Sequence, residues 1–519
     1  MHNKKLILFL IILFPAVLLC QNTPTGFLLG DENSLNKIND LTPSGNSISD
    51  IATSGDTIWV GSNRGLSVSY DKGNNWTNFY GSEAFGTESI AALTYYNGII
   101  AASTAHSIEK DGQDFAEGSG LRISFDAGRN WIVVPQPLDV PNDTVVVYGE
   151  NRLRALPVTV AVQNLTYDIA INNKYIFIAS FAGSLRKVII DSLVANPNRR
   201  WERVVLPPDR LNSVSPTDTL DFCMQPVSGK FCSENNLNYR LFSVIAINDS
   251  IIFAGSAGGI NKSTDGGISW IKYSHQNQDE PITGNFVVAL GFNKYNNRLW
   301  AATWRAEGTS EFSGVSTSSN FGESWQNYLE GEKVHNFGFK LNQVLAPADG
   351  GMFKTADNGI TWITPTLIQD DKYKIEFNIS KFYSAAESAG FTWLGSSEGL
   401  VRFTGTSDNW EGKWKIYFAS QPFAGNDDSY AFPNPFSPKL DLLKIKYKSL
   451  NSPVSIRILN FSMQPVRTII QNSVINEAEP IEYWNGKDEN GSLVPNGVYF
   501  YCIEREDSEP LYGKIIVLQ

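Results

Sequence analysis

An eight-residue stretch, Ser69-Tyr70-Asp71-Lys72-Gly73-Asn74-Asn75-Trp76, recurs along this chain of 519 residues. Each copy has Ser or Thr first, Asp or Asn third, Gly fifth and Trp eighth, and further copies begin at Ser124, Ser263, Ser318 and Thr355. A carboxylate accepts backbone N–H bonds and Gly allows a positive φ, so the pattern predicts a hairpin turn followed by a packing Trp. We expect a structural role for the third position, which is Asp71, Asp126, Asp265, Asn320 or Asp357.

A short apolar strand that ends in small residues precedes each octet, as in Ile58-Trp59-Val60-Gly61 and Ile252-Phe253-Ala254-Gly255. Counting these strands, with two degenerate copies, indicates seven units between about residues 45 and 418. Their spacing, mostly about 40 to 50 residues, is typical of four-stranded propeller blades, whereas a β-solenoid needs shorter and more even repeats. The sequence therefore predicts an all-β fold with a seven-bladed β-propeller over residues 24–418. Residues 24–42 are expected to add a strand that closes the ring.

The octet resembles the Asp-box, or BNR, repeat of sialidases, photosystem-assembly-factor-like propellers and many exported bacterial proteins. The upstream strands resemble the two-component-regulator propeller repeat, most closely at Trp393-Leu394-Gly395-Ser396-Ser397-Glu398-Gly399-Leu400. Together these resemblances span nearly the whole repeat region and imply the fold. They imply no particular function, because Asp-boxes occur at structural turns in enzymes and non-enzymes alike.

The composition agrees with a large all-β protein that has tight turns. Gly is abundant (42 residues), Trp is frequent (13) and charged residues make up only 18% of the chain. So many aromatics and so few charges exclude a disordered chain, and the composition lacks the Ala, Glu, Lys, Leu and Arg enrichment of a coiled coil. The net charge of −11 disfavours nucleic-acid binding through a basic surface.

The N-terminus has a basic segment with Lys4 and Lys5, followed by an apolar run from Leu6 to Leu19. This pattern predicts a secretory signal peptide over residues 1–20; a membrane anchor is the alternative, for which the run is short. The run ends in Cys20 like a lipobox, but Leu19 stands where that motif has a small residue, so lipidation stays open. No later segment is apolar enough to cross a bilayer, and we expect no transmembrane span in the mature chain.

Export implies an oxidising compartment, in which the remaining cysteines can form a disulfide. Cys223 and Cys232 lie close together in a polar segment, where a disulfide and two buried free thiols are the alternatives. Cys502 lies in a strand-like run and is interpreted as a small core residue. No Cys/His cluster has zinc spacing, and we expect neither a metal nor a cofactor.

Long insertions interrupt the repeats, and by the order of strands in a blade they are expected on the face opposite the octets. Loops on a rigid scaffold commonly carry function, so this face is the predicted binding surface, with tolerated elongation as the alternative. The insertions are residues 104–119, 135–165, 205–240 and 304–313. The ligand-binding candidates are Trp304, Arg305, Glu307, Glu109, Asp111 and Asp114.

Catalytic motifs are weak or missing. The resemblance to sialidases would imply an arginine cluster and a Phe/Tyr-Arg-Ile-Pro motif before the first octet, but only Arg154-Ala155-Leu156-Pro157 comes near it, after the second. A glycosidase needs two carboxylates roughly 5 to 10 Å apart across a cleft, and nothing in the sequence pairs the rim acids. The acidic run 109–114 could bind Ca²⁺ but has no EF-hand spacing. No P-loop, Rossmann, Gly-x-Ser-x-Gly or His-Glu-x-x-His motif is present.

The C-terminal part differs from the repeats. Residues 419–430 are interpreted as a polar linker, and the alternating strands of residues 431–519 predict a small immunoglobulin-like β-sandwich. This part resembles the type IX secretion sorting domain and the related flagellar-hook-cap-like fold, although Asn485 and Gln519 depart from the usual residues. The resemblance rests on the Trp484–Asp488 turn and, as sorting motif, on Pro433, Asn434, Pro435, Phe436, Gly497 and Lys514.

These observations predict an exported, non-catalytic β-propeller with a binding or structural role at a bacterial cell surface. It would pass through the periplasm and be secreted or held at the outer-membrane surface. The expected partners are the type IX secretion machinery and a surface glycan or protein, with no nucleic acid. The alternative is a secreted glycan-active hydrolase that uses carboxylates on the propeller rim; a third hypothesis is an assembly factor for another exported complex.

Overall fold

The computed structural model of the chain consists almost entirely of β-strands and turns, which confirms the all-β prediction. The predicted signal peptide and nearly all of the predicted closing strand, residues 24–42, lie outside the described residues. The helical elements that the structure describes are α1 (Ile190–Ala195) and the 3-10 turn η2 (Leu237–Tyr239). The structure describes residues 42–519 apart from 307–309, 372–375, 378, 406–408, 420–427, 440–441, 450–451, 476–479 and 507.

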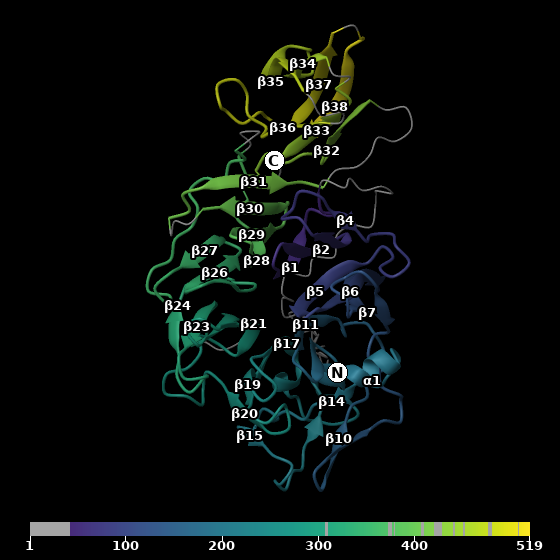
Figure 1. The fold of residues 1–519 in the computed structure, drawn as a ribbon, viewed down its shortest axis with the longest axis vertical. Helices are drawn as coiled ribbons and strands as arrows, with labels where there is room; N and C mark the ends of the chain where they lie inside the picture. The colour runs from purple at the N-terminus through teal and green to yellow at the C-terminus, as the bar shows by residue number, and fades with distance from the viewer. Residues whose placement is uncertain are drawn as a thin grey trace, which may run out of the picture.

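Seven antiparallel sheets follow one another along residues 48–417, as Figure 1 shows. The first three are β1 (Ile48–Ser54), β2 (Thr57–Ser62), β3 (Gly65–Ser69) and β4 (Thr77–Asn78); β5 (Ser89–Tyr96), β6 (Ile99–Lys110), β7 (Gln113–Ser124) and β8 (Ile132–Val134); and β11 (Thr166–Ile171), β12 (Tyr175–Ser180), β13 (Ser184–Ile189) and β14 (Glu202–Arg203). The next two are β17 (Leu241–Ala246), β18 (Ile252–Ser256), β19 (Gly259–Ser263) and β20 (Trp270–Tyr273), with β15 (Ser213–Val214) added outside β20; and β21 (Phe286–Asn293), β22 (Arg298–Trp304), β23 (Gly314–Ser318) and β24 (Gln326–Tyr328). The last two are β25 (Gly338–Lys340), β26 (Gln343–Ala348) and β27 (Gly351–Thr355); and β28 (Phe382–Ser388), β29 (Phe391–Ser396), β30 (Leu400–Thr404) and β31 (Lys413–Tyr417).

These sheets stand in a closed ring (Figure 1). β1 contacts β5, β5 contacts β11, β11 contacts β17 and β17 contacts β21. The ring continues where Phe337 and Phe339 flank Gly291 of β21, and from there β25 contacts β28, which contacts β1. A closed ring of small antiparallel sheets is the architecture of a β-propeller.

Side chains join the last sheet to the first. The ring of Trp76 lies 6.4 Å from that of Trp393 and 5.9 Å from that of Tyr417, both edge to face. Thr53 Oγ1 donates a hydrogen bond to the carbonyl oxygen of Glu387 at 2.9 Å. In the described part of the chain the last sheet takes its four strands from residues 382–417, and these contacts pack it against the first sheet.

The recurring octets all form one kind of turn. In the first copy, Ser69 Oγ donates to Asp71 Oδ1 at 2.8 Å, and the N–H of Asn75 donates to the same oxygen at 2.9 Å. The N–H of Gly73 donates to Ser69 Oγ at 2.8 Å. The other four copies repeat these three bonds, including the copy in which Asn320 replaces the acid.

The Gly of each octet lies against an aromatic side chain of the preceding sheet. Gly73 has a φ of +80°, and a Cβ added there would lie 2.5 Å from the ring of Trp393. At Gly128, φ is +91° and a Cβ would lie 2.9 Å from Nε1 of Trp59. The octet therefore fixes a chain reversal and a contact between neighbouring sheets at the same residue. The remaining three glycines face Phe177, Tyr273 and Tyr328.

The prediction that all four insertions lie on the face opposite the octets is wrong for two of them. Residues 135–165 form a hairpin of β9 (Val145–Tyr148) and β10 (Asn151–Ala155) that reaches an octet turn, where Tyr148 donates to the carbonyl oxygen of Ile268 at 2.7 Å. Residues 205–240 supply β15 to the outer edge of the fourth sheet and β16 (Cys223–Met224) to the hairpin. Both insertions thus run along the outer edge of the ring. Cys223 forms a disulfide with Cys232.

Two further sheets follow the ring and enclose a hydrophobic core of their own. Asn434 Nδ2 donates to the carbonyl oxygen of Lys514 at 2.7 Å, and the N–H of Ile516 donates to Asn434 Oδ1 at 2.9 Å. Phe436 is fully buried in this core, so the motif of residues 433–436 docks against the last strand, and Gly497 starts the strand paired with it. The sheets are β32 (Ser429–Phe432), β33 (Leu443–Tyr447) and β36 (Ile481–Trp484); and β35 (Pro465–Val474), β34 (Pro453–Leu459), β37 (Gly497–Arg505) and β38 (Leu511–Val517).

We predict that Gly73→Ala lowers the free energy of unfolding by about 2–4 kcal/mol, because it combines strain at positive φ with a clash against Trp393. Gly81→Ala is the matched control, since Gly81 has a φ of +79° and no atom within 4 Å of the added Cβ. The control should lose only about 1 kcal/mol. Urea unfolding of both variants measures the difference, and equal losses would show that contact with the preceding sheet contributes nothing.

Candidate functional site

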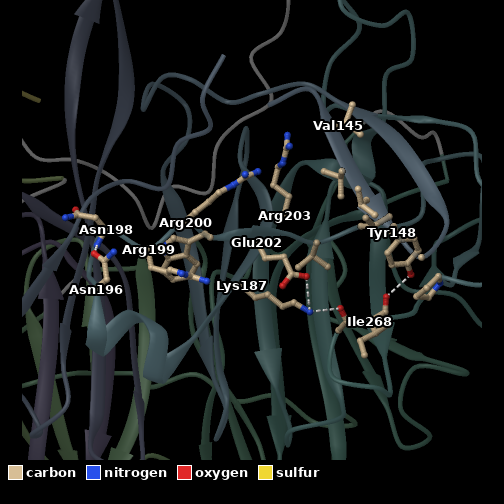
Figure 2. A pocket seen from close by; sticks show the side chains of 18 residues that line it. Val145, Tyr148, Lys187, Asn196, Asn198, Arg199, Arg200, Glu202, Arg203 and Ile268 are labelled. Atoms are coloured by element: carbon tan, nitrogen blue, oxygen red, sulfur yellow. Dashed lines mark hydrogen bonds and ion pairs between the residues drawn. The ribbon is translucent and has the colours of Figure 1, made fainter. Parts of the chain in front are cut away.

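A groove of about 770 Å³ lies at the outer edge of the third sheet. Figure 2 shows Arg200, Glu202 and Arg203 along one side and Val145 and Tyr148 along the other. The first side belongs to β14 and its flanking residues, and the second to the insertion strand β9. The groove therefore lies between a propeller sheet and the hairpin that wraps around it.

Both walls of the groove are free strand edges. β9 is the outermost strand of the sheet β16-β10-β9, and β14 is the outermost strand of the third sheet. Residues 145–149 and 198–205 line the groove without a gap. Successive side chains alternate between the two faces of a strand, so the uninterrupted lining by the four residues of β9 indicates that this strand meets the groove with its edge. Such edges carry backbone N–H and C=O groups that can pair with another chain.

The groove has more cationic than anionic side chains. The charged residues that line it are Lys187, Arg199, Arg200, Glu202 and Arg203. Arg200 and Arg203 share one carboxylate, that of Asp143, with Arg203 Nη2 at 3.0 Å from Asp143 Oδ1. Lys187 Nζ lies 3.5 Å from Glu202 Oε1. In a chain of net charge −11, this is a local excess of positive charge.

Arg203 has unfilled donors although its side chain is only 7% exposed. Its Nε and Nη1 have no hydrogen-bond partner among the described residues, and Nη1 lies 3.8 Å from Asp139 Oδ2. Burial is the main cause that lowers the pKa of Arg203, against the opposing charges of Asp139 and Asp143. These two donors are themselves buried, so the accessible guanidinium of the groove is that of Arg200, whose side chain is 64% exposed. An exposed arginine fork suits an anionic oxygen, because charge-assisted bonds to carboxylate or phosphate are strong.

A buried ion pair ties the insertion to the third sheet. Arg186 of β13 donates from Nη1 and Nη2 to the two carboxylate oxygens of Asp139, each at 2.8 Å, and both side chains are 1% exposed. The N–H of Val158 donates to Asp139 Oδ2 at 2.9 Å. Burial alone would raise the pKa of Asp139, but these bonds and the charge of Arg186 lower it. Asp139 thus holds the first part of the insertion on β13 through Arg186 and holds its last part through the N–H of Val158.

Tyr148, the last residue of β9, lines the groove, and its hydroxyl donates to the carbonyl oxygen of Ile268. The pKa of Tyr148 is raised, first by burial and then by the negative charges of Asp265 and Asp218. The groove is therefore electrostatically uneven, with cations around residues 199–203 and negative charge near Tyr148.

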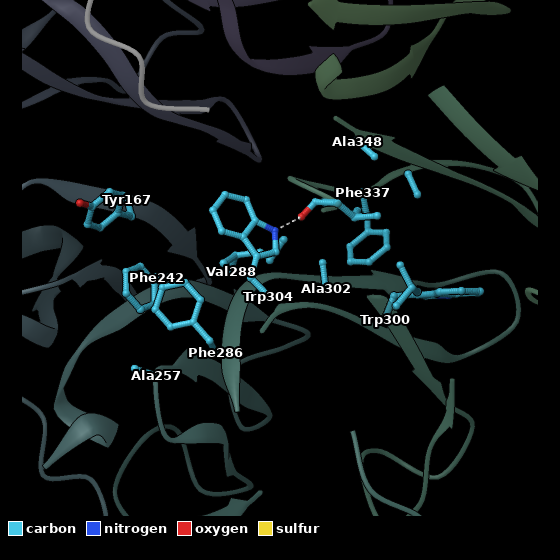
Figure 3. Close-up of a cluster of buried hydrophobic side chains, with 14 of the residues drawn as sticks. Tyr167, Phe242, Ala257, Phe286, Val288, Trp300, Ala302, Trp304, Phe337 and Ala348 are labelled. Atoms are coloured by element: carbon cyan, nitrogen blue, oxygen red, sulfur yellow. Dashed lines mark hydrogen bonds between the residues drawn. The ribbon is translucent and has the colours of Figure 1, made fainter. Parts of the chain in front are cut away.

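Trp304 is not a stacking residue on the rim, which corrects the prediction. It ends β22, is 3% exposed, and packs with Phe286 and Val288 (Figure 3). Its Nε1 donates to the carbonyl oxygen of Val334 at 3.0 Å. Along β22 the residues two and four positions apart share a face, so Trp304 points to the same side as the fully buried Trp300.

The other ligand-binding candidates do not form one site. Glu109 and Asp114 face each other across the tip of the β6–β7 hairpin, with Asp111 in its turn, and all three are exposed. Arg305 is exposed on the fifth sheet, and its N–H donates to Ser313 Oγ at 3.0 Å. Glu307 lies outside the described residues.

A second, small hollow of about 50 Å³ lies where the inner strands of several sheets meet. Six inner strands have a register shift near their first residues, and the bulged residues line the hollow. Asp50 and Asp168 also line it. Asp168 accepts the N–H of Val244 from the next sheet and of Ile169, both at 2.8 Å, and Asp50 accepts those of Leu93 and Ile51, both at 2.9 Å.

These axial carboxylates are half-buried, line the small hollow, and hold neighbouring strands together through the backbone N–H bonds that they accept. In the described part of the chain, no group of three or more His, Cys, Asp and Glu side chains could hold a metal ion. None of the helices that the structure describes is long and apolar enough to cross a membrane.

The groove residues were not among the sequence-predicted site residues. The run Arg199-Arg200-Trp201-Glu202-Arg203 is the signal that could have indicated them, since it concentrates three arginines in an acidic chain. Its Trp201 is buried (3% exposed), as the repeat pattern requires. Because the run was assigned to blade packing on account of this Trp, its arginines were not considered as ligand-binding residues.

Comparisons with known proteins show similarity to solved propeller structures only at low identity. No family model and no curated protein matches the chain. The chain is similar to PorZ, a bacterial surface component of the type IX secretion system of Porphyromonas gingivalis (12% identity, TM-score 0.38), over 91% of this chain and 66% of that one. It is also similar to a GH74 enzyme of Niastella koreensis (12%, TM-score 0.47), over 93% and 75% of the two chains. A third is YCF48 from Cyanidioschyzon merolae (15%, TM-score 0.39; 72% and 98%). At these scores, none of the likenesses bears on the ligand or activity of this chain.

The axial acids make stability depend on pH. Burial raises the pKa of Asp50 to about 7 and that of Asp168 to about 8, from 3.8. The folded chain then holds these protons more tightly than the unfolded chain, so their stabilising contribution is complete below about pH 4 and is lost as the pH rises through about 7 to 8. We predict that Asp168→Asn reduces the fall in Tm between about pH 5 and pH 8.

The measured quantity is the slope of Tm against pH, because Asn also loses one acceptor and lowers Tm at every pH. Asp126→Asn is the control: bonds from Asn130 and Ser124 lower the pKa of Asp126 to about 2, so its loss leaves this slope unchanged. If Asp168→Asn keeps the wild-type slope of Tm against pH, the raised pKa of Asp168 is not a cause of that slope.

Proposed function

We propose that this protein is an exported, seven-bladed β-propeller that binds a ligand in the groove at its third blade and catalyses no reaction. The seven sheets are the blades, and residues 24–418 form the propeller domain. Residues 1–20 are a signal peptide, residues 419–430 a linker, and residues 431–519 an immunoglobulin-like domain for sorting.

The observation that carries this proposal is the chemistry of the groove. It combines a large open volume, cationic side chains and two free strand edges, and Glu202 is the one carboxylate among its lining residues. A glycan hydrolase would need a second carboxylate across the groove. Asp50 and Asp168 lie apart from the groove, in the small axial hollow, where each accepts backbone N–H bonds. These features support binding over the alternative, a glycan-active hydrolase.

The export part of the proposal rests on the C-terminal motif. Asn434 docks on the backbone of Lys514 and Ile516, which joins the start of this domain to its last strand. A signal that must be read by the type IX machinery needs such a fixed surface, and this one is exposed at Asn434. We place the mature protein in the secreted fraction or at the outer-membrane surface, where a surface glycan or protein would be its ligand.

We predict that removing residues 428–519 leaves the protein in the periplasm. Cell fractionation and protease treatment of intact cells measure its location. Asn434→Ala should reduce surface delivery, whereas Asn460→Ala should not. Asn460 is the matched control because its side chain also makes two hydrogen bonds to the backbone of this domain, accepting the N–H groups of Ser462 and Gln464, away from the motif. Unchanged surface delivery of the truncated chain would refute the export proposal.

A further inference from the structure

We infer that the groove binds an extended peptide segment that carries acidic side chains and pairs with the free edge of β9. This inference rests on the proposed binding function and names the chemical class of its ligand. A strand edge offers N–H and C=O groups at regular spacing, and a peptide in extended conformation is the ligand that can pair with all of them. β9 is the longer of the two edges, with four residues against two in β14.

The side chains of the groove favour a peptide over a glycan. Val145 and Val147 of β9 are 37% and 64% exposed, so the edge is flanked by aliphatic surface that a β-branched or aliphatic side chain can cover. Trp201 is buried, and the hydroxyl of Tyr148 is bound to Ile268. The groove thus has no open Trp face on which a sugar ring could stack.

The charges set the direction of the ligand. Arg200 and Arg203 pair with Asp143, two residues before β9 begins, so these cations lie near the Val145 end of β9, and Arg200 is 64% exposed there. Asp218 and Asp265 place negative charge near the Tyr148 end. A uniformly acidic polymer would be repelled at that end, whereas a peptide with its acidic residues over the arginines and a neutral remainder matches both ends.

The test is fluorescence anisotropy on the full mature chain with labelled peptides of about eight residues. Three peptides are compared: one in which Thr and Glu alternate in one half and Thr and Ser in the other, the same peptide with Lys for Glu, and the Glu peptide N-methylated along one edge. We expect micromolar binding of the Glu peptide, weakened by salt, and at least about tenfold weaker binding of the other two.

Arg200→Glu should weaken binding of the Glu peptide at least about tenfold, because it removes a cation and adds an acid at the binding end. Arg457→Glu is the control, since Arg457 is a partly exposed arginine that is also paired with one carboxylate, that of Glu504, but lies in the C-terminal domain. Its binding should equal that of the wild type.

Other outcomes overturn the inference. Equal binding of the N-methylated peptide would refute strand pairing, and equal binding of an oligogalacturonate would show a general polyanion site. If no peptide binds while the full chain still reaches the cell surface, the ligand class is wrong and the export proposal stands. If the chain stays in the periplasm but the Glu peptide binds, the export proposal alone fails.

Discussion

The contact between an octet glycine and an aromatic ring of the preceding sheet is the constraint on which the rest of the ring depends. At this residue the chain needs a positive φ for the turn and no side chain for the packing, so two requirements meet in one glycine. Each copy places the next sheet against the one before it. Because the ring is closed, the first copy, at Gly73, also receives Trp393 from the last sheet. For the five sheets that contain an octet, the contact with the preceding sheet is thus encoded in a local motif.

The groove lies between the octet turn at Gly267 and Ile268 and the third sheet, in which this constraint is absent. The third sheet has no octet; between β13 and β14 the chain instead forms α1 and continues through residues 196–201. This longer path carries the arginines outward, where a tight octet turn would have returned directly into the last strand. The insertion hairpin then covers the same edge, held by the buried pair of Arg186 and Asp139. Breaking such a pair from one side leaves an uncompensated buried charge, so the hairpin is firmly placed.

The sequence pattern was sufficient for the turns and the repeat, since the octet has a local physical cause. It failed at Trp304, which was assigned to a loop although it continues the alternation of β22 by one residue and so shares the buried face of Trp300. It also missed the groove, whose walls come from segments about fifty residues apart, at Val145–Tyr148 and around Arg203. Local periodicity cannot show that two edges of separate sheets face each other. The arginine-rich run was visible, but its position beside a packing Trp pointed to the blade core.

The difference between the negative net charge of the chain and the positive charge of the groove explains how the groove can select a ligand. The chain as a whole carries −11, so its surface repels anions in general and non-specific binding of polyanions is suppressed. An acidic segment gains attraction in the groove, where Arg199, Arg200 and Arg203 outnumber their carboxylate partners. The acids near Tyr148 oppose the reverse orientation. Backbone pairing then supplies affinity that depends little on sequence, while the charges set direction, which is the division of labour expected for strand addition at an edge.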